Sequence, residues 1–401
     1  ITVKETGGST IQGRAEVSVK PVLMGILGFR DLNVKASSTA SGSHTPVDIA
    51  LVLDNTGSMR GQKLADLKSA AKSLVETVYA DPAAVDDVRM SVVPFAEYVN
   101  VGMANRYAAW MSVPPDSTTT RTVCNSGSGS AQTASSIDGS SAMASSTEPA
   151  PSCTPGETYY VDDVETVCPS GTQSSTAPRS APSGSGGSAS ALGALDFTAS
   201  CRTITETKVW RGCAGSRPDP LNTKDEQYSV RVPGILNVNC PTVLKPLTNS
   251  QTDLAAAIDA MSASGNTFTP SGLMWGWASL SQEEPYAEAA DGSRSPPPRK
   301  VIVFMTDGQN TISPTQPYDG SHMGTNTLQA NQITTQLCGN VKAAKVEVYT
   351  LAFQVNDPGI KSVLENCASS PSHYFDAANS AALQAAFNNI GGNLASLRLV
   401  D

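Results

Sequence analysis

Two alternating patterns of apolar and polar residues run along most of this chain. Apolar side chains dominate the segments 47–53 and 88–95, which predicts buried strands, and apolar residues recur at helical spacing from Met59 to about Tyr79. The same alternation returns later, with predicted helices at 252–261, 325–344, 358–367 and 380–394 and predicted strands at 301–306, 346–353 and 373–375. Alternating strands and helices predict an α/β fold with a doubly wound, mainly parallel sheet.

The first part of the chain follows a different pattern. Segments 14–20 and 32–36 alternate apolar and polar residues with a period of two, which predicts a hairpin. We therefore expect residues 1–46 to form a small accessory β region, with residues 395–401 as a candidate additional strand.

A long interruption separates the two halves of the α/β pattern. Periodicity fades between residues 104 and 250, and the stretches 126–147 and 170–193 are rich in Ser, Gly and Ala. Such stretches contain too few large apolar residues to pack a core. The predicted organisation is an α/β domain formed by 47–103 and 251–394, with residues 104–250 as an insertion.

Composition and charge narrow the classes of partner. The chain has 401 residues, of which 39% are hydrophobic, enough for more than one packed core. Lys and Arg number 27 against 36 Asp and Glu, giving a net charge of −9. Without a basic patch to neutralise phosphates, nucleic acid is excluded as a partner.

No window reaches the about 18–20 apolar residues of a membrane span, so we expect membrane attachment only through a segment upstream of Ile1.

The cysteines indicate an oxidising compartment. Eight are present, none in a Cys-x-x-Cys pair, and only three histidines accompany them, which gives a zinc ribbon little support. Disulfides are the simpler interpretation. Six of the eight fall in the predicted insertion, at Cys124, Cys153, Cys168, Cys201, Cys213 and Cys240. Sequence alone leaves their connectivity open.

Oxygen-bearing side chains follow the ends of the predicted elements. Asp54, Thr56 and Ser58 come directly after the first buried strand; Thr267 precedes a predicted helix, and Asp307 ends the strand at 301–306. In an open α/β sheet, ligands bind at the carboxyl ends of the strands, and carboxylates and hydroxyls are the hard ligands that Mg²⁺ prefers. One such loop alone is more often an ordinary helix cap, but all three together predict a divalent metal site.

The order and chemistry of these residues resemble the metal-ion-dependent adhesion site (MIDAS) of the von Willebrand factor type A domain, D-x-S-x-S followed by T and D. Thr56 replaces the more common Ser, which keeps the hydroxyl and adds a methyl group. The resemblance implies that Asp54, Thr56, Ser58, Thr267 and Asp307 bind one divalent cation, some of them through water, with Mg²⁺ expected and Mn²⁺ or Ca²⁺ as alternatives. It further implies an open coordination position for an acidic side chain of a protein partner.

The segments 272–277, 367–375 and 397–399 are similar to TadG-like proteins of bacterial tight-adherence (Flp) pilus loci. This resemblance implies a non-enzymatic role in pilus assembly or as a pilus-associated adhesin, with pilins or a surface target as partners. It places the protein in the periplasm or at the cell surface. It also implies a disulfide between Cys338 and Cys367, where the family often has a pair.

Three other classes of protein fit this sequence less well. A hydrolase needs a nucleophile on a strand-to-helix turn, whereas Ser-Gly runs such as 184–186 lie in low-complexity sequence. A dinucleotide-binding enzyme needs Gly-x-Gly-x-x-Gly after the first strand, where this chain has residues 54–58 instead. An intracellular chelatase-like subunit also uses a type A domain, but the eight cysteines argue against a location in the reducing interior of the cell.

Overall fold

A computed structural model describes most of the chain. The described residues are 2–5, 10–19, 32–41, 46–80, 84–125, 158–161, 164–167, 200–240, 242–290, 294 and 296–396. The Ser/Gly-rich stretches 126–147 and 170–193 and the candidate strand residues 397–401 lie outside them. No helix in the described part of the chain is long and apolar enough to cross a membrane.

A six-stranded sheet forms the centre of the α/β domain. Its strand order is β14 (Lys245–Thr248), β5 (Val88–Phe95), β4 (Val47–Asp54), β15 (Arg299–Thr306), β16 (Val346–Phe353) and β17 (Tyr374–Ala377). The five strands from β5 to β17 are parallel, and β14 is antiparallel to β5. The predicted α/β fold with a mainly parallel sheet is therefore confirmed.

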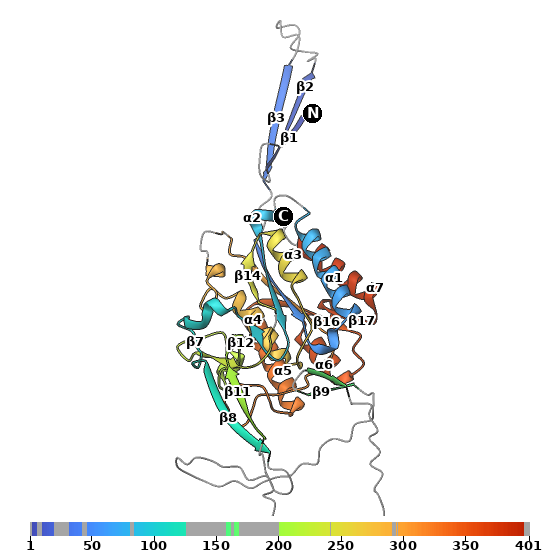
Figure 1. Ribbon diagram of the computed structural model, residues 1–401. Helices are drawn as coiled ribbons and strands as arrows, with labels where there is room; N and C mark the ends of the chain where they lie inside the picture. The colour runs from blue at the N-terminus through green and yellow to red at the C-terminus, as the bar shows by residue number, and fades with distance from the viewer. Residues whose placement is uncertain are drawn as a thin grey trace, which may run out of the picture. The chain divides into compact units, whose positions relative to one another are not determined.

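Helices cover both faces of this sheet. Because successive side chains of a strand point to opposite faces, Leu51 and Leu53 of β4 join one hydrophobic cluster and Val52 joins the other. The first cluster packs under α1 (Gln62–Val78), α3 (Gln251–Asp259) and α7 (Ser380–Ser396); Figure 1 shows α1 and α7 side by side. The second packs under α4 (Thr269–Ser279), α5 (Thr327–Ala343) and α6 (Pro358–Cys367).

Shorter elements complete the described structure. They are α2 (Ala84–Asp87) and the 3₁₀ helices η2 (Gly57–Met59), η3 (Met103–Tyr107), η4 (Leu221–Thr223), η5 (Glu288–Ala290) and η6 (Pro371–His373). At the N-terminus, β1 (Thr2–Glu5), β2 (Thr10–Val19) and β3 (Leu32–Ser41) form an antiparallel sheet, which confirms the predicted hairpin. Two further pairs are β8 (Ser117–Asn125) with β11 (Ser200–Lys208), and β9 (Thr158–Val161) with β10 (Val164–Val167).

Part of the segment predicted as an insertion packs within the α/β unit. A second sheet has the order β6 (Val99–Asn100), β12 (Trp210–Ala214), β13 (Val232–Leu236) and β7 (Met111–Ser112). Trp210 is 1% exposed and belongs to the same hydrophobic cluster as α4. By backbone contacts, residues 1–119 and 206–401 form one compact unit and 120–205 another, a division that differs from an insertion spanning 104–250.

The chain returns to the main sheet close to the point where it left it. Asn100, just after β5, forms a bridge with Val243, and the Leu244 N–H donates to the Asn100 carbonyl at 2.8 Å. The strand β14 then pairs with β5. The two ends of the segment between Asn100 and Val243 therefore lie side by side at one edge of the sheet.

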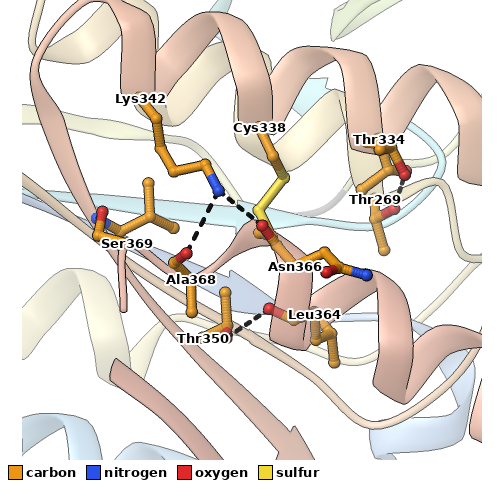
Figure 2. Close-up of a disulfide and its surroundings, with 12 residues drawn as sticks. Thr269, Thr334, Cys338, Lys342, Thr350, Leu364, Asn366, Ala368 and Ser369 are labelled. Atoms are coloured by element: carbon orange, nitrogen blue, oxygen red, sulfur yellow. Dashed lines mark hydrogen bonds between the residues drawn. A yellow bond between two sulfur atoms is a disulfide. The ribbon is translucent and has the colours of Figure 1, made fainter. Parts of the chain in front are cut away.

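A buried disulfide joins α5 to α6. Cys338 and Cys367 are bonded, as the sequence resemblance implied, and are 2% and 1% exposed. Figure 2 shows the Lys342 ammonium beside this bond, where it donates to the carbonyl oxygens of Asn366 and Ala368 at 2.6 and 3.3 Å. A cation at the carboxyl end of a helix satisfies carbonyls that lack intrahelical partners. The disulfide and the lysine together fix the end of α6 against α5.

The second described disulfide lies in the segment predicted as an insertion. It joins Cys213 to Cys240, so two of the six cysteines there pair with each other as expected, and no cysteine of the described structure is free. The pairing of Cys124, Cys153, Cys168 and Cys201 lies outside the side chains that the structure describes.

Loss of the Cys338–Cys367 bond is expected to destabilise the α/β unit. The two cysteines are 29 residues apart, and the chain-entropy estimate for a loop of that length is about 3.5 kcal/mol. The double variant Cys338→Ala/Cys367→Ala should therefore unfold at a lower denaturant concentration than wild type, by about 2–4 kcal/mol in unfolding free energy. Urea unfolding followed by tryptophan fluorescence measures this, and an unchanged midpoint would contradict it.

Candidate metal centre

Parallel pairing of β4 with β15 places two acidic residues at one edge of the sheet. Leu53 lies opposite Met305 in the register, so the strands end side by side at Asp54 and Thr306, and Asp307 follows directly. Both Asp side chains are buried, with residue exposures of 0% and 6%. Residues 253 positions apart in the chain thus meet where α/β proteins bind ligands.

Both carboxylate oxygens of Asp54 accept hydrogen bonds. The backbone N–H of Thr56 donates to Oδ1 at 2.8 Å, and the hydroxyl of Thr306 donates to Oδ2 at 2.6 Å. These bonds satisfy a carboxylate that burial separates from water. They also fix its orientation toward the loop that follows β4.

A chain of hydroxyls connects that loop to Asp307. Ser58 Oγ donates to Asp307 Oδ1 at 2.6 Å, and Thr56 Oγ1 lies 2.9 Å from Ser58 Oγ. Because the Ser58 proton is used toward Asp307, the Thr56 hydroxyl is the donor to Ser58. Neighbouring oxygens around an octahedral ion with bonds of about 2.1 Å are about 3 Å apart. The two hydroxyl oxygens therefore have the spacing of adjacent Mg²⁺ ligands, and the residues fit such an ion.

The loop that carries Thr267 is held to the first loop by its backbone. The Gly57 N–H donates to the Gly265 carbonyl at 3.0 Å, and the Ser264 N–H donates to the Asn55 carbonyl at 2.9 Å. The Thr267 N–H donates to Thr311 Oγ1, on the loop after Asp307, at 2.9 Å. All three predicted loops therefore converge. Side-chain hydrogen bonds link Thr56, Ser58 and Asp307, and the Thr56 N–H joins Asp54 to them. Thr267 is bonded through its backbone to Thr311, which is not one of the predicted ligands.

Close packing of α4 positions this second loop. Gly272 and Gly276 face the sheet. A Cβ on Gly272 would lie 2.5 Å from the Phe95 ring, and a Cβ on Gly276 would lie 2.4 Å from a Val52 methyl. At the start of the helix, Asn310 Oδ1 accepts from the Thr269 N–H at 2.7 Å. The helix is therefore fixed both against the sheet and to the loop after β15.

The negative charges at this edge repel each other. Burial, together with the nearby negative charge of Asp307, raises the pKa of Asp54 from its ordinary 3.8 to about 6. The ammonium of Lys63 forms an ion pair with Asp307 Oδ2 at 2.8 Å. A site with two close carboxylates and one lysine favours a cation.

The described residues contain no cluster of three or more His, Cys, Asp or Glu side chains suited to a metal ion. A metal centre here would consist of two carboxylates and hydroxyl groups, which favours Mg²⁺ over transition metals. The ligand set of Asp54, Thr56, Ser58, Thr267 and Asp307 stays a prediction that this geometry fits.

Sequence reasoning missed two residues of this site. Thr306 holds Asp54, and its only signal in the sequence is a hydroxyl residue directly before the acidic end of a strand. Lys63 pairs with Asp307, and its signal is a lysine in the first turn of the helix that follows the Asp-x-Thr-x-Ser loop.

A buried Ser–His contact lies elsewhere in the same unit. The Ser216 hydroxyl is 2.8 Å from His322 Nε2, while His322 Nδ1 is 2.6 Å from the Glu97 carbonyl, to which it must donate. His322 is 3% exposed; its imidazole stacks on the Tyr98 ring and also contacts the Phe268 ring, which is tilted against it. Burial lowers its pKa to about 4. A base this weak and enclosed gives the hydrolase alternative no support.

Comparison with known proteins identifies the class of domain. The sequence profile of the von Willebrand factor type A domain matches residues 226–389, a range that includes Thr267 and Asp307 but not residues 54–58. The chain therefore contains a von Willebrand factor type A domain. No curated protein matches the chain.

Several solved structures are similar to this chain at low identity. The pilus adhesin SpaC from Lactobacillus rhamnosus GG in its open conformation is 13% identical, with a TM-score of 0.43, over 99% of this chain and 33% of that one. The von Willebrand factor domain of the type V pili tip protein Mfa5 from Porphyromonas gingivalis is 11% identical, with a TM-score of 0.44, over 89% and 97%. Proximal thread matrix protein 1 from the mussel byssus, with a zinc-occupied MIDAS motif, is 12% identical, with a TM-score of 0.36, over 89% and 49%.

The chain spans about a third of the length of the SpaC adhesin. At these identities and TM-scores, the likenesses carry no information about this chain's ligands or partners.

Cation binding is expected to weaken as the pH falls through about 6. The folded-state pKa of Asp54 is raised, so protonation of this group stabilises the metal-free fold below about pH 4, and that contribution is lost as the pH rises through about 6. Because a cation requires the ionised carboxylate, binding below pH 6 must release a proton. The affinity for Mg²⁺ should then fall by up to about tenfold per pH unit, as calorimetry at pH 7.5 and 5.0 will measure.

Calorimetry at pH 6 in two buffers with different ionisation enthalpies should detect the released proton directly. At pH 8, where Asp54 is already ionised, proton release should vanish. Equal affinity and no proton release across this range would show that Asp54 does not take part in binding.

Proposed function

We propose that this protein is a non-enzymatic, divalent-cation-dependent protein-binding module. Asp54, Thr56, Ser58, Thr267 and Asp307 would hold the ion, with Mg²⁺ as the expected species. The observation that carries this proposal is the hydroxyl pair of Thr56 and Ser58 at 2.9 Å, flanked by two buried carboxylates at one sheet edge. The bound ion would supply a positive centre that attracts a further carboxylate from a partner.

Each ligand has a separate task in this proposal. The three hydroxyls, of Thr56, Ser58 and Thr267, present neutral oxygens, so they bind an ion without cancelling its charge. Asp54 is oriented by Thr56 and Thr306, and Asp307 is oriented by Ser58. An ion held by few anionic ligands keeps its attraction for an acidic side chain of another protein.

The biological setting is inferred from the sequence segments that resemble TadG-like proteins. We infer a role in tight-adherence pilus assembly or as a pilus-associated adhesin, with pilins or a surface target as partners. The periplasm or the cell surface is the corresponding location. Two disulfides in the described structure are consistent with an oxidising compartment and disfavour an intracellular chelatase-like role.

Removal of either acidic ligand is expected to abolish cation binding. Asp54→Ala and Asp307→Ala should each lower the affinity for Mg²⁺ or Mn²⁺ below detection in calorimetry, because the remaining ligands are neutral hydroxyls and a single carboxylate. The matched control is Asp376→Ala, which removes a carboxylate of β17 that pairs with Lys361 of α6. Equal affinity in wild type and both site variants would refute the metal assignment.

The partner-binding part of the proposal has a separate test in cells. A strain carrying Asp54→Ala at normal expression should show fewer pili or weaker attachment, and chelation should reproduce the defect in the wild-type strain. Unchanged piliation and adherence would mean that the role of the protein lies outside this site.

A further inference from the structure

Lys63 is the one positively charged group that the described structure places in direct contact with a predicted metal ligand. Its ammonium lies 2.8 Å from Asp307 Oδ2, and the lysine and aspartate side chains are 29% and 0% exposed. Other charged groups of these loops bind elsewhere: Arg60 Nε contacts the Ala263 carbonyl at 3.5 Å, and Glu97 accepts from the Asn266 side chain at 3.0 Å.

The two oxygens of Asp307 have different partners. Oδ1 accepts from the Ser58 hydroxyl, within the chain of candidate ligands, and Oδ2 accepts from Lys63. The lysine therefore contacts the oxygen that does not take part in the hydroxyl chain. In this arrangement Lys63 can remain paired with Asp307 while the hydroxyls and the other oxygen hold a cation.

The lysine changes the net charge of the centre. Asp54 and Asp307 together carry two negative charges, which a divalent cation alone would balance to zero. With Lys63 included, the loaded centre carries one positive charge. A nearby positive charge opposes cation binding and favours binding of an anion, and it acts strongly where side chains are partly desolvated.

We propose that Lys63 sets the charge of this centre, so that it lowers the affinity for the divalent cation and raises the affinity of the loaded site for a carboxylate. This inference rests on the proposed function and identifies a residue that determines specificity for an acidic partner. In the metal-free protein the same lysine compensates the buried carboxylate of Asp307.

The experiment uses Lys63→Met, which keeps the length and apolar part of the side chain and removes its charge. Lys68→Met on the same helix is the matched control, because the Lys68 ammonium contacts the Asp259 carbonyl and none of the candidate ligands. Lys63→Arg retains the charge. Calorimetry with Mn²⁺ measures cation affinity, and the water-proton relaxation of the Mn²⁺-loaded protein, titrated with acetate, measures carboxylate binding.

The two affinities should change in opposite directions in Lys63→Met. We expect Mn²⁺ to bind about fivefold or more tightly and acetate to bind about fivefold or more weakly, while Lys68→Met and Lys63→Arg stay near wild type. The rise in melting temperature on addition of Mg²⁺ should also be larger in Lys63→Met, since the metal-free variant has an uncompensated buried carboxylate.

Other outcomes are decisive as well. Weaker Mn²⁺ binding in Lys63→Met would mean that the lysine only orients Asp307, and unchanged affinities would mean that it has no role; either result overturns the inference while leaving the metal site intact. Absence of Mn²⁺ binding in the wild-type protein would instead overturn the proposed function itself.

Discussion

Two buried carboxylates held together at one sheet edge are the constraint on which the proposed metal centre depends. Parallel pairing of β4 with β15 brings Asp54 and Asp307 together, so the fold itself creates a repulsion between like charges. The surrounding contacts reduce it: Ser58 and Thr306 donate hydroxyl hydrogen bonds, and Lys63 supplies a positive charge. The carboxylates and hydroxyls of this arrangement are the ligand types of the divalent cation that we propose.

Much of the fold could be predicted from the sequence because its central strands are buried on both faces. Such strands are nearly continuous apolar runs, and the predicted bounds of β5 (Val88–Phe95) and β16 (Val346–Phe353) agree with the structure at both ends. The helix α6 begins at Pro358, and its N-cap residue Asp357 accepts a hydrogen bond from the Ile360 N–H; this Asp-Pro start is also a strong local signal. The convergence of the three loops follows from strand order, since neighbouring parallel strands end at the same edge.

What sequence reasoning missed depends on contacts between distant segments. The hydrogen bonds of Thr306 with Asp54 and of Lys63 with Asp307 each join residues roughly 250 positions apart, and no local pattern encodes them. Strand β14 has four residues, Lys245–Thr248, including a proline and no clear alternation, so it is a strand only because β5 offers it an open edge. Trp210 likewise belongs to the core through its neighbours rather than through any period.

Because Asn100 and Val243 form a bridge, the point where the chain leaves the main sheet lies next to the point where it returns. The entropy of closing a loop rises only slowly with its length, so the number of residues between these two points has little influence on the sheet. Residues 120–205, which form a separate compact unit within that stretch, can therefore change in length during evolution and leave the edge of the proposed metal centre as it is. One scaffold can in this way present different surfaces, and an added domain or reporter inserted between residues 120 and 205 would leave the strand order of the main sheet unchanged.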